Sequence, residues 1–262
     1  MNKPVTLSVA GSDSSGGAGI QVDLRMFSAL GTFGTTAITA LTAQNPGQVK
    51  AVVGMEAEFV KAQIDAVFEA LPVRAMKTGM LWSAEVIQAV AEFLKANPGV
   101  ACVVDPVMIA TSGAKLVADE AIDVYKTELL PRATLITPNI DEAQVLLDGR
   151  TIGSDDQAEA AQALSERYRC AVLLKGGHLP GDPVDLLFEK GEVYRWTNRR
   201  LENVNTHGTG CMLSAAITAY LAHGKSLKEA VEKGLVAVHH ALAHPVIPAE
   251  GLALAGIETV TC

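Results

Sequence analysis

The chain has 262 residues, of which 49% are hydrophobic and 19% are charged. That length fits one large α/β domain, and because no linker or internal repeat interrupts the pattern we predict a single domain over residues 1–262. A formal charge of −8 without any basic run argues against nucleic acid as a partner, and no apolar run approaches the roughly 18 residues of a membrane-spanning helix.

The cysteines are scattered and show no Cys-x-x-Cys spacing. They are Cys102, Cys170, Cys211 and Cys262. We therefore expect neither a zinc site nor a disulfide framework, and we expect a reducing, cytoplasmic environment. The opening Met-Asn-Lys-Pro leads directly into a strand-like segment, which predicts that no signal peptide is present.

The chain begins with a short apolar run at 5–10, typical of a buried parallel strand. A loop at 11–19 follows, with four glycines among its nine residues. It matches neither the dinucleotide fingerprint nor the P-loop. A plain connector would rarely need so much conformational freedom, so we expect this loop to lie where open α/β sheets bind ligands, at the carboxyl end of a strand.

Apolar strand patterns and amphipathic helix patterns then alternate through most of the chain. Strands are predicted at 35–43, 49–54, 73–78, 101–105, 133–137 and 171–174, and helices at 20–30, 59–71, 84–95, 119–130, 155–168, 211–222 and 226–243. Short strands at 185–188, 192–196 and 201–203 predict a small antiparallel hairpin extension, and residues 245–262 a loosely packed tail. The alternation predicts a three-layer α/β/α fold around a mostly parallel sheet.

Polar residues recur where these strands end. Gln44 can offer both an acceptor and donors to a heterocycle, although a glutamine before a turn is usually a turn residue. Asp105 is placed to meet a metal or a phosphate, and Lys175, followed by two glycines, suits a charge that reaches over a polyphosphate. Asn139 and Glu142 can face the same edge, although helix capping alone explains this pair.

The segment at 205–211, Asn-Thr-His-Gly-Thr-Gly-Cys, opens onto an alanine-rich helix pattern. A glycine-rich turn at a helix N-terminus presents unpaired N–H groups to an anion, so Gly208, Thr209 and Gly210 predict a phosphate site. Cys211 would lie in the first helical turn, where the thiol pKa is expected to be lowered. The alternative is an ordinary glycine turn with a small buried cysteine.

Together these residues form one rim of the sheet, with carboxylates for magnesium, a cation for phosphate and an anion hole. Phosphoryl transfer requires this combination, because positioning and charge stabilise its transition state. The alternative outside the enzymes is a protein that binds a small molecule without catalysis. Such a protein would need neither Lys175 nor the anion hole.

Short motifs follow one another in order over nearly the whole chain. They are Ala10-Gly11-Ser12-Asp13 with Gly16–Gln21 and Asp23, Ala40–Asn45, Lys77-Thr78-Gly79-Met80, Asp105-Pro106-Val107-Met108, Thr137-Pro138-Asn139 with Glu142-Ala143, Leu174–His178, and His207–Cys211. With these motifs the chain resembles the hydroxymethylpyrimidine and phosphomethylpyrimidine kinases of thiamin biosynthesis, a branch of the ribokinase-like family. The resemblance implies two successive ATP-dependent phosphorylations, first of 4-amino-5-hydroxymethyl-2-methylpyrimidine and then of its monophosphate.

The resemblance also implies roles for individual residues. Gln44 would hold the aminopyrimidine, and the rest of its pocket would be lined by Gly11, Asp23, Met80 and Val107. The ATP phosphates would meet Lys175, Asp105, Asn139 and Thr206, and Mg²⁺ would be bound by Asp105 and Glu142 directly or through water. The backbone N–H groups of Gly208, Thr209, Gly210 and Cys211 would form the anion hole.

Cys211 stands where the wider ribokinase family usually has an aspartate base. It either accepts the hydroxyl proton or positions the hydroxymethyl group, because a thiol of low pKa is also a weaker base. The alternative enzyme is a pyridoxal or pyridoxine kinase. Pyridoxal-accepting relatives of this branch carry a second cysteine after Asp-Pro-Val-Met, where this chain has Ile109-Ala110-Thr111-Ser112 in a small polar loop.

The hairpin extension at 185–203 leaves exposed strand edges that a second copy of the chain could cover. We therefore expect a homodimer that binds a small pyrimidine and ATP, with no nucleic-acid or membrane partner.

Overall fold

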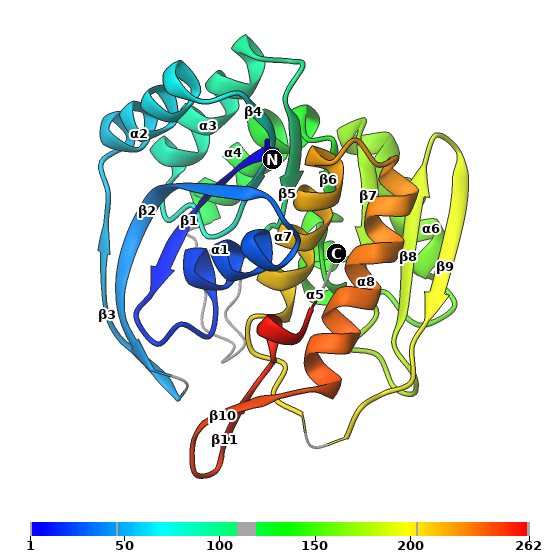
Figure 1. Cartoon of the computed structure of the whole chain (residues 1–262). Coiled ribbons are helices and arrows are strands. Elements are labelled where there is room, and N and C mark those ends of the chain that lie inside the picture. The colour runs from blue at the N-terminus through cyan, green and yellow to red at the C-terminus, as the bar shows by residue number, and fades with distance from the viewer. Residues whose placement is uncertain (1, 46, 109–118, 203, 261–262) are drawn as a thin grey trace.

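A nine-stranded sheet forms the centre of the computed structural model (Figure 1), which describes all residues except 1, 46, 109–118, 203, 261 and 262. The strand order is β3-β2-β1-β4-β5-β6-β7-β8-β9. The bounds are β1 Val5–Asp13, β2 Phe33–Asn45, β3 Gln48–Gly54, β4 Val73–Thr78, β5 Ala101–Val104, β6 Leu135–Ile136, β7 Ala171–Leu174, β8 Val184–Glu189 and β9 Glu192–Thr197.

The sheet is parallel from β2 to β7 and antiparallel at both edges. At one edge β3 pairs with β2, and at the other β8 and β9 form the predicted hairpin extension. The third short strand predicted there is wrong for Leu201 and Glu202, which lie outside any strand, while Asn203 is outside the described residues. A mostly parallel sheet with a small antiparallel extension is thus confirmed.

Helices cover both faces of the sheet (Figure 1). One face carries α2 Ala57–Ala70, α3 Ala84–Ala96, α4 Asp119–Val124, α5 Ile140–Leu146 and α6 Gln157–Tyr168, and the other carries α1 Gly19–Ala29, α7 Thr209–Ala222 and α8 Leu227–Ala243. A hydrophobic core lies on each face of the sheet. Because successive side chains of a strand point to opposite faces, each strand contributes to both cores: in β5, Val104 packs on the α3 side and Val103 on the α7 side. The helix predicted at 119–130 changes to a π-helical turn at Tyr125–Leu129 and a 3-10 turn at Leu130–Arg132.

Capping side chains fix several helix starts. Ser83 accepts a hydrogen bond from the Val86 N–H at the start of α3, as its position predicts. Asn139 and Glu142 form a reciprocal capping box on α5, and this predicted structural role is confirmed. Because β6 ends three residues earlier, the box also places both side chains at the carboxyl edge of the sheet.

Two of the differences from the predicted boundaries bear on the site and on the tail. Strand β1 runs three residues further, to Asp13, because a register shift at Gly11 lets Ser12 and Asp13 pair with β2. The tail is only partly loose. Its hairpin of β10 Val246–Ala249 and β11 Leu252–Leu254 lies largely at the surface, but Ile257 is buried in the core between α1 and α8. In the part of the chain that the structure describes, no helix has the length and apolarity needed to cross a membrane.

Candidate functional site

The N-terminus of α7 is the centre of the predicted site. Gly208 caps the helix with φ +78°, a left-handed conformation that favours glycine, and the helix begins at Thr209, two residues earlier than predicted. The Thr209 N–H donates to the carbonyl oxygen of Thr206 (3.2 Å). The N–H groups of Gly210 and Cys211 follow in the first turn, where a helix has no internal acceptor to offer them.

Asp105 and Lys175 lie directly against this helix start. Their Oδ1 and Nζ atoms are 3.1 Å apart, and the Thr137 hydroxyl donates to the same Oδ1 (3.0 Å). A Cβ on Gly210 would lie 3.3 Å from Asp105 Oδ2 and 3.4 Å from Lys175 Nζ, so both side chains lie against the backbone of Gly210. The structure therefore brings together three residues predicted for phosphate chemistry: Asp105 directly after β5, Lys175 directly after β7 and Gly210 in α7.

The charge of Lys175 is secured by its neighbours. Burial lowers the pKa of Lys175, but the carboxylates of Asp105 and Glu142 more than reverse this, so its pKa lies above the ordinary value. Glu142 experiences the opposite balance. Burial raises the pKa of Glu142 to about 7, assisted by Asp105 and opposed by Lys175. Two acidic groups and one cation thus share one buried corner of the site.

A second lysine–carboxylate pair lies beneath the same helix start. Lys77 at the end of β4 and Asp23 in α1 are both fully buried, with 2.9 Å between Nζ and Oδ1, and the Ser8 hydroxyl donates to Asp23 Oδ2 (2.5 Å). Burial lowers the pKa of Lys77, but Asp23, Cys211 and Asp105 reverse this and raise it. Lys77 was not predicted to have a role. The available signal was a lysine inside the otherwise buried end of a strand.

The prediction of a lowered pKa for Cys211 is wrong. Cys211 lies in the first turn of α7, but desolvation raises the pKa of its thiol to about 11, and Asp23 and Asp105 add to this effect. Lys77 and a hydrogen bond from the Gly19 backbone act in the other direction without overcoming it. The thiol is therefore protonated at neutral pH.

Four of the predicted pyrimidine-binding residues, Gly11, Gln44, Met80 and Val107, lie at the carboxyl ends of β1, β2, β4 and β5, and Asp23 lies in α1. Gly11 and Met80 face each other, because a Cβ on Gly11 would lie 2.6 Å from Met80 Cε. Gln44 and Val107 are half-buried, and the Val107 N–H donates to the Asp105 carbonyl (2.9 Å). Asp23 differs from the prediction: its side chain has no exposed surface and supports the site from beneath instead of lining an open pocket.

Thr206 is exposed at the turn that precedes α7. Its carbonyl accepts hydrogen bonds from both the N–H and the hydroxyl of Thr209 (3.2 and 2.9 Å), so its structural role is to hold the turn. Asn139 is half-buried, and its backbone pairs with Lys175 between the ends of β6 and β7. The loop at 109–115 that bears on the pyridoxal alternative lies outside the described residues.

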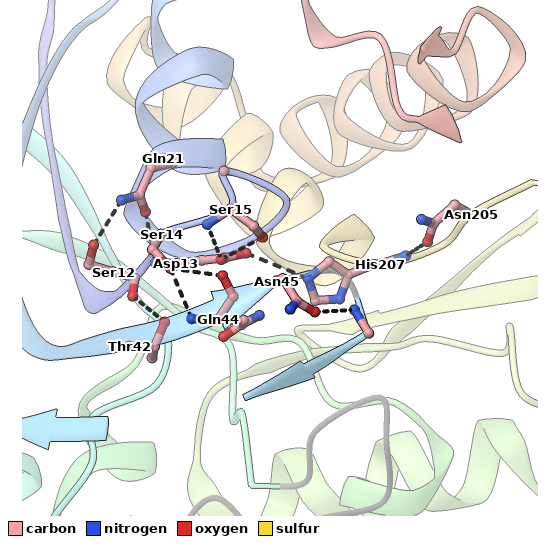
Figure 2. Close-up of polar contacts among 12 residues, drawn as sticks. Ser12, Asp13, Ser14, Ser15, Gln21, Thr42, Gln44, Asn45, Asn205 and His207 are labelled. Atoms are coloured by element: carbon pink, nitrogen blue, oxygen red, sulfur yellow. Dashed lines mark hydrogen bonds and ion pairs between the residues drawn. The ribbon is translucent and has the colours of Figure 1, made fainter. Parts of the chain in front are cut away.

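A set of contacts that was not predicted joins the glycine-rich loop after β1 to the segment before α7 (Figure 2). Asp13 and His207 face each other across these two segments, with 3.6 Å between Oδ2 and Nε2. On the opposite side of the loop, the Ser14 hydroxyl is hydrogen-bonded to the backbone N–H and carbonyl of Gln44 (2.9 and 2.8 Å).

Comparison with known proteins identifies this arrangement. The model of the phosphomethylpyrimidine kinase family matches residues 13–253. The chain belongs to the phosphomethylpyrimidine kinase family. A hydroxymethylpyrimidine/phosphomethylpyrimidine kinase of Rhizobium meliloti is 49% identical over 241 residues, which cover 91% of this chain and 90% of the relative.

Solved structures agree with the family and with the ribokinase-like fold. A phosphomethylpyrimidine kinase of Clostridium difficile is 44% identical with a TM-score of 0.82, covering 91% of this chain and 99% of its own. A pyridoxal kinase of Staphylococcus aureus in complex with AMP-PCP and pyridoxal is 31% identical with a TM-score of 0.88, covering 99% and 96%. The chain is therefore a kinase, and ATP is its expected phosphoryl donor.

Proposed function

We propose that this chain transfers the terminal phosphoryl group of ATP to the hydroxymethyl group of 4-amino-5-hydroxymethyl-2-methylpyrimidine, and then phosphorylates the resulting monophosphate to the diphosphate used in thiamin assembly. The observation that carries the proposal is the convergence of Asp105, Lys175 and Gly210 at the N-terminus of α7. Membership of the phosphomethylpyrimidine kinase family supports the choice of substrate.

The site suits stabilisation of charge on a transferring phosphoryl group. Lys175 stays protonated beside Asp105 and Glu142, and it can turn its charge towards a phosphate that enters from the partly exposed side. The N–H groups of Gly210 and Cys211, together with the turn at Gly208 and Thr209, would form the anion hole. Positioned donors and cations are what phosphoryl transfer demands of a protein.

The two carboxylates fit a magnesium ion. Asp105 and Glu142 are buried and share the charge of one lysine, so a divalent cation would relieve their mutual repulsion. The described residues contain no group of three or more histidine, cysteine or acidic ligands. Mg²⁺ commonly takes one or two protein carboxylates and completes its shell with water and phosphate oxygens. Bound there, it would neutralise charge on the phosphates, with Asn139 and Thr206 nearby on the ATP side.

The acceptor pyrimidine would lie between Gln44 and the pair of Gly11 and Met80, with Val107 on the neighbouring strand end and Asp23 beneath. The side-chain amide of Gln44 offers the donor and acceptor that an aminopyrimidine edge needs. A thiol whose pKa is about 11 is a poor proton acceptor at pH 7, so we assign Cys211 to positioning the hydroxymethyl group instead of removing its proton.

Phosphate transfer from MgATP should be measured in parallel with hydroxymethylpyrimidine, its monophosphate and pyridoxal. The proposal expects product from both pyrimidines and little from pyridoxal. Pyridoxal is the necessary comparison because a pyridoxal kinase shares the fold with a TM-score of 0.88. Pyridoxal as the best substrate would contradict the assigned specificity but not the phosphate site. Binding of a pyrimidine without ATP consumption would contradict the kinase assignment and favour a binding protein.

We further propose that residues 1–262 act as one domain, that two copies associate, and that the protein works in the cytoplasm. The exposed edge strand β9 supports the dimer, because an unpaired edge is a natural site for association. Sedimentation at micromolar concentrations separates a dimer from a monomer directly. Replacing Val193, an exposed apolar residue on β9, with lysine should weaken the dimer if this edge forms the interface.

A further inference from the structure

The glycine-rich loop between β1 and α1 rests on the turn that forms the anion hole. The Gly17 carbonyl oxygen lies so close to Gly208 that a Cβ built on Gly208 would be 2.1 Å from it. A Cβ on Gly17 would in turn lie 2.9 Å from Cδ2 of His207. A movement of this loop towards the turn would therefore displace Gly208 or His207. His207 immediately precedes the predicted phosphate donors.

Asp13 and His207 face each other at this contact (Figure 2). One carboxylate oxygen of Asp13 is fully used, because the Ser15 N–H and hydroxyl both donate to Oδ1 (2.8 and 2.7 Å). The other oxygen, Oδ2, is buried without a hydrogen-bond partner among the described residues, and so is His207 Nε2. Their separation of 3.6 Å is slightly longer than a hydrogen bond, so a shift of about 0.7 Å would join them.

Several surrounding groups keep the Asp13 carboxylate ionised. Burial raises the pKa of Asp13, but His207 and the hydrogen bonds from Ser15 outweigh it and the net shift is downward. The nearby Arg25 donates to the Gly16 carbonyl (3.2 Å) and is itself paired with Glu258 (2.6 Å), so the far side of the loop is also fixed. A negative charge thus faces the unpartnered ring nitrogen across the junction.

The loop also reaches the acceptor side of the site. Ser14 is hydrogen-bonded to both backbone groups of Gln44, and Thr42 donates to the Ser12 carbonyl (2.9 Å). Consequently one short segment contacts the strand that presents Gln44, through Ser14, and the turn that presents Gly208, through Gly17. The Asp13–His207 contact is the charged element of that link.

We propose that Asp13 and His207 are a positioning pair that fixes the glycine-rich loop to the anion-hole turn, so that acceptor pyrimidine and phosphate donors are held in a single productive geometry. This inference rests on the proposed kinase function. Loss of this contact should slow phosphoryl transfer strongly although neither side chain takes part in the reaction, because a displacement of about 1 Å can reduce a rate by about a hundredfold.

The kinetic test uses the full-length variants His207→Ala, Asp13→Asn and the double variant, with either pyrimidine as acceptor. Each single variant should lower kcat/KM for the acceptor by about 10- to 100-fold, while the KM for ATP changes by less than about threefold. The kcat/KM of the double variant should be no lower than that of the less active single variant, because the two substitutions remove the same contact. His207→Gln, which keeps a donor at a similar reach, should recover part of the loss.

The matched control is His223→Ala, at the other end of the same helix. The His223 ring lies 2.8 Å from the Leu30 carbonyl and ties α7 to α1 far along the helix from the turn. This variant should lose some thermal stability and keep its acceptor kinetics. Values of kcat/KM within threefold of wild type in a folded His207→Ala, or losses that simply add in the double variant, would overturn the proposal.

Amide hydrogen exchange provides a readout that does not depend on catalysis. His207→Ala and His207→Gln should exchange faster than wild type in peptides covering 13–19 and 205–210, and His223→Ala should not. Unchanged exchange in these peptides would overturn the positioning role. If wild type phosphorylates neither pyrimidine, the proposed function fails in the same assay, and the exchange data still decide whether the pair fixes the loop.

Discussion

Two lysine–carboxylate pairs of the same chemistry lie on either side of the N-terminus of α7, and they differ in exposure. Lys77 and Asp23 have no exposed surface, whereas the side chain of Lys175 keeps 17% of its surface beside Asp105 with 3%. The first pair is enclosed by Ser8 and the core, and the second shares its corner with Thr137, Glu142 and the bare backbone of Gly210. The enclosed pair has satisfied its charges internally, and the open pair can exchange a protein partner for a phosphate.

The largest effect is expected at the open pair. Lys175→Met should reduce kcat by about 10²- to 10³-fold, because it removes the cation that faces the transferring phosphoryl group. Its unfolding transition should shift much less than that of a variant in the enclosed pair. The measurement is steady-state kinetics with both pyrimidines, combined with thermal unfolding.

Lys61→Met is the matched control for Lys175→Met. Lys61 lies on α2 and is ion-paired with Asp65 on an exposed face, with 55% of its side-chain surface accessible. This variant should keep wild-type kinetics. A Lys175→Met variant that retains its kcat would contradict the division into an open catalytic pair and an enclosed structural one.

Substitutions in the enclosed pair of Lys77 and Asp23 should lower the unfolding free energy more than the activity. Lys77→Met leaves the Asp23 carboxylate buried without its ammonium, which typically costs about 3–5 kcal/mol of unfolding free energy. Adding Asp23→Leu should restore much of that loss, since a buried pair replaced by apolar groups is often neutral. Urea unfolding measures both variants. If Lys77→Met folds with normal stability but loses turnover, Lys77 acts in the reaction and the comparison fails.

Sequence patterns correctly predicted those features of the fold that a local rule determines. Strand and helix alternation gave the parallel sheet, and the capping pair Asn139 and Glu142 was found from its spacing alone. The carboxyl-end rule for parallel strands correctly gathered Asp105, Lys175 and Gly210 in one place. These predictions succeeded because the information lies within a few residues or follows from a general topology.

The failures depend on surroundings that distant segments provide. The Cys211 prediction considered the helix N-terminus but not the burial contributed by α1, β4 and β5, which sets the thiol pKa. Asp23 was placed in the pocket wall because nothing local reveals that Lys77, 54 residues later, closes over it. The Asp13–His207 contact joins residues that lie far apart in the sequence and has no signal in spacing.

Glu142, which lies beside the open pair of Lys175 and Asp105, should make the stability of the protein depend on pH. Its folded-state pKa is about 7, above the ordinary glutamate value of 4.5, so the folded chain holds this proton more tightly than the unfolded chain does. Unfolding free energy should therefore fall as pH rises from about 4.5 to 7, and Glu142→Gln should be more stable than wild type at pH 8 by about 1–3 kcal/mol. Denaturant unfolding at pH 5 and pH 8 tests this, with little difference expected at pH 5.

The same Glu142→Gln variant separates stability from activity. Its amide oxygen can still accept from the Asn139 N–H at the helix start, so the capping box is retained. Activity should fall and require more Mg²⁺, because one carboxylate of the proposed metal pair is lost. Equal stability of the two proteins at both pH values would contradict the raised pKa.

The smallest effect is expected at Cys211, which lies between the two pairs. Because its thiol is protonated below about pH 11, Cys211→Ala should retain kcat within about tenfold, with an increased KM for hydroxymethylpyrimidine from the lost contact. Cys170→Ala, which removes a buried thiol directly before β7, is the control for general loss of packing.

The pH dependence of kcat decides between the two roles left open for this thiol. A catalytic thiolate would make wild-type kcat rise about tenfold per pH unit between pH 7 and 9, and Cys211→Ala would abolish that rise. A positioning thiol gives parallel profiles for the two proteins over the same range. Parallel profiles would also mean that the Lys77 ammonium stabilises the fold and does not stabilise a Cys211 thiolate. The enclosed pair would then have no direct part in the reaction.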